Sequence, residues 1–198
     1  MPSLIERLRE NLRSAHTGPP RFEGDAAVSG MPPESGKTVA AAVLMPIVDR
    51  PEPGLILTTR SANLRNHAGQ IAFPGGRVDA DDRDAAAAAL READEEIGLP
   101  PASVEVIGLA DPYRTITGFR ITPVVGIVPP DIALRPSPAE VADIFEVPLC
   151  RLLDSRKHVR RQAVWEGATR TWYEIHVDGR RIWGATAGMI VNLAARLG

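Results

Sequence analysis

Three glutamates near the end of one predicted helix have the residue type and spacing that suit metal chemistry. Residues at i, i+3 and i+4 share a helix face, so we expect Glu92, Glu95 and Glu96 to converge within one turn. Glu92 and Glu96 repel each other there, and the negative end of the helix dipole disfavours both. A bound cation would relieve the conflict, and carboxylate oxygens suit Mg²⁺ or Mn²⁺. The alternative is an ordinary solvated acidic face.

The helix that carries these acids is bounded by clear signals. An alanine-rich stretch, residues 84–97, has helical periodicity, and Asp82 or Asp84 can cap its start. Gly98 and then Pro100 end it. A narrow apolar stripe is expected to pack against a sheet, and it consists of Ala86, Leu90, Ala93 and Ile97.

The acidic end of this helix resembles the second half of the Nudix hydrolase signature. That half reads Arg-Glu-hydrophobic-x-Glu-Glu-x-Gly-hydrophobic, and the matching residues here are Arg91-Glu92-Ala93-Asp94-Glu95-Glu96-Ile97-Gly98-Leu99. The first half of the signature, Gly, five residues, Glu and seven residues, fits less well. Gly76 lies one residue further from Arg91 than the signature requires. An aspartate-rich stretch, residues 79–84, replaces the early glutamate.

The segment before the glycines resembles a motif of the coenzyme A pyrophosphatase branch of Nudix hydrolases. That motif contains Leu-Leu-Thr-x-Arg followed by Ser or Ala, then Arg, Gly and Phe-Pro-Gly-Gly. Its counterpart here is Leu57-Thr58-Thr59-Arg60-Ser61, Arg65, Gly69 and Phe73-Pro74-Gly75-Gly76, with Ile56 at the first leucine position. Branch members share the one-residue insertion and the aspartates, so the departure from the signature points to the branch.

The resemblance extends along most of the chain. Residues 137–141, 145–149 and 182–187 are similar to later segments of the same branch, so the likeness covers roughly residues 38–190. We therefore expect an N-terminal helix and irregular lead-in over residues 1–37, followed by a Nudix hydrolase domain over residues 38–198.

The resemblance implies hydrolysis of the pyrophosphate of coenzyme A, or of a derivative, to 3′,5′-ADP and 4′-phosphopantetheine. It implies Mg²⁺ or Mn²⁺ as cofactor, held by Glu92, Glu95, Glu96 and Gly76. Metal ions neutralise a pyrophosphate and activate water. Two other functions stay open. The chain could be a Nudix hydrolase of another nucleoside diphosphate derivative, such as ADP-ribose, a dinucleoside polyphosphate or an oxidised nucleotide. It could also be a catalytically weak nucleotide-binding module.

The remaining candidate residues surround this metal set. Glu95 and Glu140 are candidate general bases, and Arg91 is expected to hold a glutamate in place. The small-molecule substrate is expected to meet Gly75, whose backbone allows close approach. Cations for its 3′-phosphate would come from Arg60, Arg65 and His67. Ordinary loop packing or surface exposure is the alternative for each of these residues.

Sequence periodicity predicts one α/β (α+β) domain. The resemblance implies a Nudix-like α/β/α sandwich with a mixed β-sheet and the catalytic helix packed on it. The N-terminal helix is expected over residues 4–13, an irregular stretch from Thr17 to Gly36, and a C-terminal helix over residues 186–197. Strands are expected over residues 40–48, 55–60, 71–73, 104–110, 121–128, 144–147, 158–165, 171–177 and 180–183. Pro74-Gly75-Gly76 is expected to stop the third of these strands, residues 111–115 to form a loop, and Asp178-Gly179 to form a two-residue hairpin turn.

Composition excludes several classes of protein. The 198 residues, 44% of them hydrophobic, allow one domain with a substantial core. A net charge of -2 favours neither nucleic acid nor a membrane as a partner. With one cysteine, Cys150, the chain cannot form an internal disulfide, which is consistent with the reducing cytoplasm. Cys150 is expected to be a small buried residue. No apolar run approaches the ~18 residues of a membrane span. A monomer and a homodimer both fit this fold.

Overall fold

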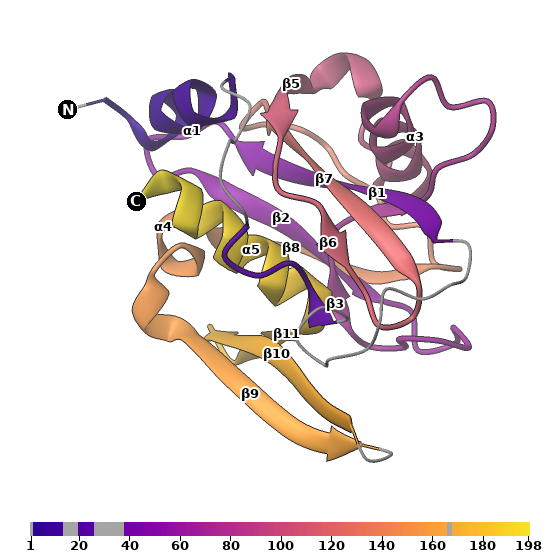
Figure 1. The fold of residues 1–198 in the computed structure, drawn as a ribbon. Helices are drawn as coiled ribbons and strands as arrows, with labels where there is room; N and C mark the ends of the chain where they lie inside the picture. Colours follow the sequence, from indigo (N-terminus) through magenta and orange to yellow (C-terminus); the bar gives the residue numbers. More distant parts are fainter. Residues whose placement is uncertain (1, 14–19, 26–37, 166–167) are drawn as a thin grey trace.

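The computed structural model describes residues 2–13, 20–25, 38–165 and 168–198 and arranges them as two β-sheets, the larger covered by helices on both faces (Figure 1). The stretch from Thr17 to Gly36, predicted to be irregular, lies outside the described residues apart from 20–25. Within the described ranges, no helix has the length and apolar character needed to cross a bilayer.

The larger sheet has eight strands and mixed direction. Its path runs β3-β2-β1-β7-β5, while β4 pairs with β1, β6 with β7 and β8 with β2. The long β1–β7 pair is parallel and the other pairs are antiparallel, so the predicted mixed sheet is confirmed. The strands are β1 (Val39–Val48), β2 (Gly54–Arg60), β3 (Ile71–Ala72), β4 (Gly75–Arg77), β5 (Glu105–Leu109), β6 (Tyr113–Arg114), β7 (Phe119–Val128) and β8 (Val141–Pro148).

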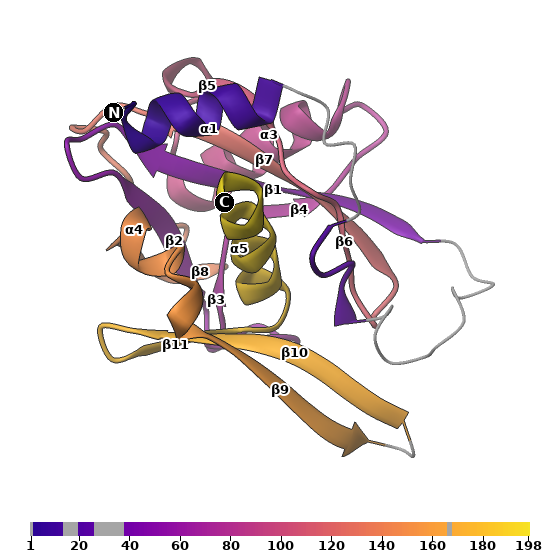
Figure 2. The ribbon, with the colours of Figure 1, turned by 60° about the vertical axis from the view of Figure 1, so that its left-hand side comes forward.

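Four described helices accompany this sheet. They are α1 (Leu4–Arg13), α3 (Ala85–Ile97), α4 (Leu149–Leu152) and α5 (Gly184–Leu197), with short 3₁₀ turns at Pro101–Ser103 and Ser155–Lys157. Helix α3 covers one face of the sheet, whereas α1 and α5 lie on the other (Figure 2). The predicted α/β/α sandwich is therefore confirmed.

The hydrophobic core is divided into two clusters, one on each face of the larger sheet, because side chains of the central strands alternate between the faces. Successive side chains of a strand point to opposite faces. In β1, Leu44 therefore joins the cluster that contains Ala93 of α3, whereas Met45 and Ile47 join the cluster that contains Ile190 of α5. The central strands are consequently apolar on both sides, as expected for a sheet buried between two helical layers.

The smaller sheet extends beneath α5 (Figure 2). Its strands are β9 (His158–Trp165), β10 (Ala168–Val177) and β11 (Arg180–Trp183), in the order β11-β10-β9. The hairpin predicted at Asp178-Gly179 is confirmed, and both turn residues have positive φ, 48° and 74°. Ile175 and Ile182 face inward and join the same core as α5.

Several local predictions are wrong. Gly75-Gly76 does not simply stop a strand, because β4 begins at Gly75 and pairs with β1. The segment predicted to be loop around Tyr113 contains β6, since backbone pairing with β7 outweighs its weak local pattern. Strand β8 is longer than predicted and begins at Val141. Cys150 is exposed, because it lies on the outer side of the short helix α4.

Candidate active site between α3 and β4

Helix α3 is held against the sheet by its alanines and fixed at both ends. The carboxylate of Asp84 accepts a hydrogen bond of 2.8 Å from the N–H of Ala87, which caps the first turn. Gly98 adopts the left-handed conformation, φ 63°, that ends a helix. The buried side chains of Ala88, Ala89 and Ala93 allow close contact with β1 and β4. This packing sets the position of the glutamates that follow.

Glu92 lies directly against Gly76 of β4. A Cβ atom built at Gly76 would be only 2.5 Å from Oε1 of Glu92, so any larger residue would displace this carboxylate. Glycine at this position therefore allows the Glu92 carboxylate to lie against β4. It leaves the backbone of β4 open to a ligand held by the same carboxylate.

Glu96 is the most deeply buried acid of the helix, with 4% of its surface exposed. The N–H of Gly75 donates a hydrogen bond of 3.1 Å to Oε2, and Nη1 of Arg60 lies 3.9 Å from Oε1. Burial nevertheless raises the pKa of Glu96 to about 7, because these two partners offset only part of the cost of removing the charge from water.

Negative charge accumulates at this point of the molecule. Burial raises the pKa of Glu92 as well, and its contact with Arg91 offsets this only partly. The charge of Glu140 raises the pKa of both Glu92 and Glu96, which places all three carboxylates within electrostatic reach of one another. Such a set favours a proton or a cation at its centre.

The loop that carries Glu140 is tied to the end of α3. The N–H of Ser137 donates to the carbonyl of Glu96 at 2.8 Å, and the N–H of Glu140 donates to the carbonyl of Ser137 at 2.9 Å. The carbonyl of Glu140 accepts a hydrogen bond of 2.8 Å from the N–H of Ser61, directly after β2. Glu140 thus stands between α3 and Arg60 of β2, and it is exposed to solvent.

Arg91 organises the acids around it. Its guanidinium donates to Asp82 at 2.9 and 3.1 Å and to Glu92 at 2.9 Å, and it also bonds the carbonyl of Arg77. The hydrogen bond from Arg91 is the main cause of the lowered pKa of Asp82. The ion pair between Arg91 and Asp82 holds Arg91 beside Glu92 and joins α3 to the turn after β4.

Sequence reasoning missed the role of Asp82. It had only been considered as a helix cap, whereas Asp84 forms the cap and Asp82 binds Arg91. Asp82 lies six positions after Gly76, which is the position of the early glutamate in the Nudix signature. This spacing alone could have identified Asp82 as the replacement for that glutamate. The inserted residue therefore falls between Asp82 and Arg91.

The expected convergence of three α3 glutamates is only partly correct. The side chain of Glu95 is 60% exposed and pairs with Arg91 at 3.4 Å, because residues 92 and 96 take the face that contacts β4. Arg65 and His67 lie on the exposed turn between β2 and β3, where Nδ1 of His67 is 3.1 Å from Oε1 of Gln70. In the described structure neither contacts an α3 glutamate.

The donor set fits a divalent metal ion, although no preformed cage of three or more His, Cys, Asp or Glu side chains is found among the described residues. Glu92 and Glu96 are the two under-neutralised carboxylates, and the glycine backbone beside them leaves room that a Cβ would fill. Oxygen donors of this type suit Mg²⁺ or Mn²⁺. Glu140 is near enough to add its charge.

Comparison with known proteins identifies the family. The NUDIX domain model matches residues 37–165. The Nudix hydrolase NudL of Escherichia coli K12 is 51% identical over 162 residues, which cover 80% of this chain and 82% of NudL. NudL of Shigella boydii gives the same identity and coverage, 51% over 162 residues, 80% and 82%.

Solved structures are similar at lower identity. Caenorhabditis elegans Ap4A hydrolase has 17% identity and a TM-score of 0.48, with 55% of this chain and 80% of that one covered. The Nudix hydrolase RenU of Mycobacterium smegmatis has 23% identity and a TM-score of 0.49, with 59% and 74% covered. The assignment therefore rests on the sequence matches: this chain belongs to the Nudix family and is a pyrophosphohydrolase.

Proposed function

We propose that this enzyme hydrolyses the pyrophosphate bond of coenzyme A or a coenzyme A derivative, with Mg²⁺ or Mn²⁺, to 3′,5′-ADP and 4′-phosphopantetheine. One observation carries the substrate assignment. Two residues of the coenzyme A pyrophosphatase motif, Arg60 and Gly75, both contact Glu96, although they lie on different strands. These two positions of the motif therefore lie beside a carboxylate that we propose to be catalytic, which supports the substrate assignment.

Each site residue has a defined part in this reaction. Glu92 and Glu96 would hold the metal, which when bound neutralises the pyrophosphate and activates water. Arg91, fixed by Asp82, keeps the Glu92 carboxylate in place. The guanidinium of Arg60, 27% exposed, lies where it can meet an anionic phosphate beside Glu96.

The chemical step needs an acceptor for one proton. A water oxygen attacks one phosphorus, the bridging P–O bond breaks, and the phosphate of the other product leaves with that bridging oxygen. Glu140 is our first candidate for the carboxylate that takes the proton from water, since it is exposed and its charge acts on Glu92 and Glu96. Glu95, which is exposed and bonded to Arg91, is the second candidate.

The direct test is product analysis after incubation of pure protein with coenzyme A, with and without Mg²⁺ or Mn²⁺. We expect 3′,5′-ADP and 4′-phosphopantetheine only when metal is present. Turnover of ADP-ribose or a dinucleoside polyphosphate, with coenzyme A left intact, would keep the Nudix chemistry and contradict the substrate assignment.

A substitution tests how the 3′-phosphate is recognised. Arg65 is exposed on the turn between β2 and β3, so its loss should leave the fold intact. We expect Arg65→Ala to raise KM for coenzyme A about 5- to 20-fold and to change KM for dephospho-coenzyme A much less. A hydrogen bond to a charged group contributes roughly 1.5–3 kcal/mol, and exposure to water reduces this for Arg65. Arg160→Ala, on exposed β9, is the control. Equal losses on both substrates would remove Arg65 from 3′-phosphate recognition.

A further inference from the structure

The smaller sheet packs on the rest of the molecule with only one of its faces. Ile175 and Ile182 point toward α5 and join its core, so their neighbours along the strands point to the opposite side. In Figure 2 the larger sheet and the helices lie on one side of the smaller sheet, and no other element of the described chain covers the opposite side. We call that side the outer face, and the strand register places on it Arg161, Trp172, Glu174, His176, Arg181 and Trp183.

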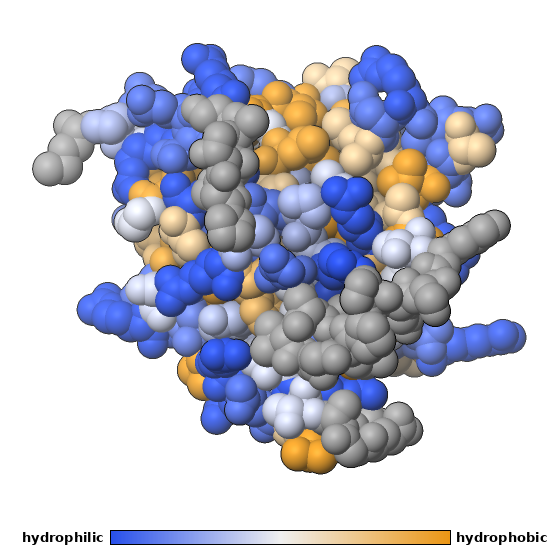
Figure 3. Space-filling model, viewed as in Figure 1, coloured by the Kyte–Doolittle hydropathy of each residue, from blue (hydrophilic) through white to orange (hydrophobic). Residues whose placement is uncertain are grey.

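Positive charge is concentrated in the strands that form this face. Residues 158–183, from the start of β9 to the end of β11, contain five arginines and three acids, a net charge of +2, so the rest of the chain carries -4. The net charge of the whole chain, -2, hides this segregation. In Figure 3 hydrophilic residues dominate the lower part of the molecule, where the smaller sheet lies. The smaller sheet therefore attracts anions although the chain as a whole does not.

Glu174 holds the cations of the outer face in place. Its carboxylate accepts hydrogen bonds from Arg181 and, at 3.4 Å, from Nε of Arg161. Both arginines nevertheless keep 52% of their side-chain surface exposed. A guanidinium has five N–H donors, so the contact with one carboxylate leaves donors of each arginine for an anion at the surface. The outer face thus presents cations whose positions are already fixed, which lowers the cost of ordering them when a ligand binds.

Two tryptophans add aromatic surface between these cations. Trp183 lies opposite Glu174 in the β10–β11 pair, and Trp172 lies two residues before Glu174, so the two rings are diagonal neighbours on one face. Diagonal neighbours in a sheet are roughly 7–8 Å apart. Trp183 is 37% exposed, and Cζ of Arg181 lies 5.2 Å from its ring centre. Exposed tryptophan beside arginine is a surface on which nucleobases stack.

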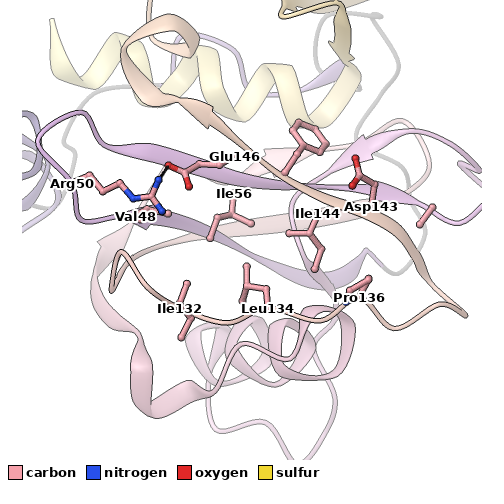
Figure 4. A pocket seen from close by; sticks show the side chains of 11 residues that line it. Val48, Arg50, Ile56, Ile132, Leu134, Pro136, Asp143, Ile144 and Glu146 are labelled. Carbon is pink, nitrogen blue, oxygen red and sulfur yellow. Dashed lines mark hydrogen bonds and ion pairs between the residues drawn. The ribbon is translucent and has the colours of Figure 1, made fainter.

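The cavity beside β8 has a different character, although its volume is about 380 Å³ (Figure 4). Both terminal nitrogens of Arg50 donate within the protein, to Glu146 at 3.1 Å and to the carbonyl of Pro130 at 2.8 Å. The ring of Phe145 is covered by the guanidinium of Arg180, with Cζ 3.7 Å from the ring centre. Of these two surfaces, the outer face is the one that offers half-exposed cations beside aromatic rings.

We propose that the outer face of the smaller sheet binds a single-stranded polynucleotide. The phosphates bond Arg161 and Arg181, and the bases stack on the two tryptophans. The bases must be unpaired, because those of a duplex are stacked on one another and cannot lie on a sheet face. Contacts of this kind do not read base edges, so binding tolerates changes of sequence. The groups that hold these four residues belong to the smaller sheet, so binding here is independent of the proposed reaction.

Fluorescence anisotropy of a labelled oligoadenylate RNA of about 12 nucleotides, titrated with the whole protein, tests the proposal. We expect a Kd between roughly 1 and 100 µM at physiological salt, the range of sequence-independent binding. DNA of the same sequence should bind with similar affinity. An RNA duplex of the same length should bind about fivefold more weakly or less well still, because its bases cannot stack on Trp172 and Trp183.

Two substitutions on the outer face separate stacking from charge. Trp183→Ala removes an exposed ring and should weaken RNA binding about fivefold or more. Arg161→Gln keeps a hydrogen-bond donor but removes one charge, so it should weaken binding and reduce the slope of log Kd against log salt concentration by about 0.7. Arg83→Gln is the matched control, because Arg83 is 85% exposed and lies just before α3, away from the smaller sheet. Circular dichroism checks each fold, and Arg161→Gln alone decides the test if Trp183→Ala does not fold.

Four results would overturn the proposal. The first is an unchanged anisotropy up to about 100 µM protein. The second is native affinity in both outer-face variants, or a loss in Arg83→Gln as large as that in Arg161→Gln. The third is a duplex that binds as tightly as the single strand, since charge alone would then account for binding. The fourth is binding of phosphatidylserine vesicles, lost in Arg161→Gln, by a protein that binds neither oligonucleotide, which would make the outer face a membrane surface instead.

Discussion

Two buried glutamates in this molecule have opposite electrostatic surroundings. Glu96 of α3 and Glu174 of β10 are 4% and 5% exposed. Glu174 accepts hydrogen bonds from Arg181, its closest partner, and from Trp172 at 3.0 Å, and these lower its pKa to about 2. Burial raises the pKa of Glu96 to about 7, since a backbone N–H and a more distant arginine offset it incompletely.

We interpret this difference in pKa as the difference between a structural acid, Glu174, and a catalytic one, Glu96. Glu174 lies in a sheet whose neighbouring arginines, Arg161 and Arg181, supply the positive charge within the protein itself. Glu96 shares its surroundings with Glu92 and Glu140, so the protein leaves negative charge to be balanced from outside. A strongly perturbed acid with such surroundings is typical of catalytic sites. The two residues therefore provide matched positions for mutagenesis.

Neutralising Glu96 should have the largest effect. We expect Glu96→Gln to lower kcat/KM on the order of 10²–10³-fold, the range for removing one group that stabilises charge in a transition state. The amide oxygen can still accept the hydrogen bond from Gly75, so the fold should be retained. Steady-state kinetics with saturating metal measures the loss, and circular dichroism checks the fold. Near-native turnover by a folded variant would show that Glu96 is not part of the machinery.

The two acids should also differ in how pH affects stability. A carboxyl whose pKa is raised from 4.5 to about 7 stabilises the folded state below pH 4.5, and this contribution is lost as pH rises through 7. The shift of about 2.5 units corresponds to at most about 3 kcal/mol. In EDTA, we expect the free energy of unfolding in urea to fall between pH 5 and 7.5, and to fall much less in Glu96→Gln.

Glu174 should leave this pH window unaffected. Its pKa is lowered from 4.5 to about 2, so its contribution is complete above pH 4.5 and is lost as pH falls toward 2. Parallel titration curves for the native protein and Glu96→Gln between pH 5 and 7.5 would contradict the assignment of the raised pKa to Glu96. Added Mg²⁺ should remove the decline, because a cation favours the ionised carboxylate.

A smaller loss is expected from Asp82, which acts through Arg91 and not on the substrate. Asp82→Asn keeps one acceptor for the guanidinium but removes the charge that holds it. We expect activity to fall roughly 10- to 100-fold, the range for residues that support metal ligands. A positioning role predicts partial rescue at high metal concentration and full activity in Asp82→Glu, which restores the residue type of the signature. Loss of folding without a change in metal dependence would indicate a purely structural role.

The sequence predicted the framework of the site better than its details. The spacing of Glu92, Glu96 and Gly98 fixed the helix and its end, because caps and helical periodicity are local properties. Local rules could not separate Glu95 from its neighbours, since all three share a helical arc and only the position of β4 decides which of them is buried.

Non-local pairing explains what was missed. Gly75 and Tyr113 read as turn and loop, yet both pair with long central strands that lie far away in sequence. The cluster around Glu174 gave no signal either, because Arg161 and Arg181 reach it across neighbouring strands of the smaller sheet. In both cases the partner strand, which a single sequence does not identify, determines the environment.

The last comparison is the same substitution at the second glutamate. Glu174→Gln should leave kcat/KM within about twofold, because the side chains that bond Glu174 are Arg161, Trp172, His176 and Arg181 of the smaller sheet and not the proposed catalytic glutamates. It should lower the free energy of unfolding by about 1–2 kcal/mol at neutral pH. The cost stays modest because Arg161 and Arg181 are each 52% exposed and can be hydrated when the charge is lost. Urea unfolding of Glu174→Gln, in parallel with Glu96→Gln, measures this loss of stability. If Glu174→Gln reduced turnover as much as Glu96→Gln does, balance of charge would not distinguish the functional acid from the structural one, and the smaller sheet would have to take part in the reaction.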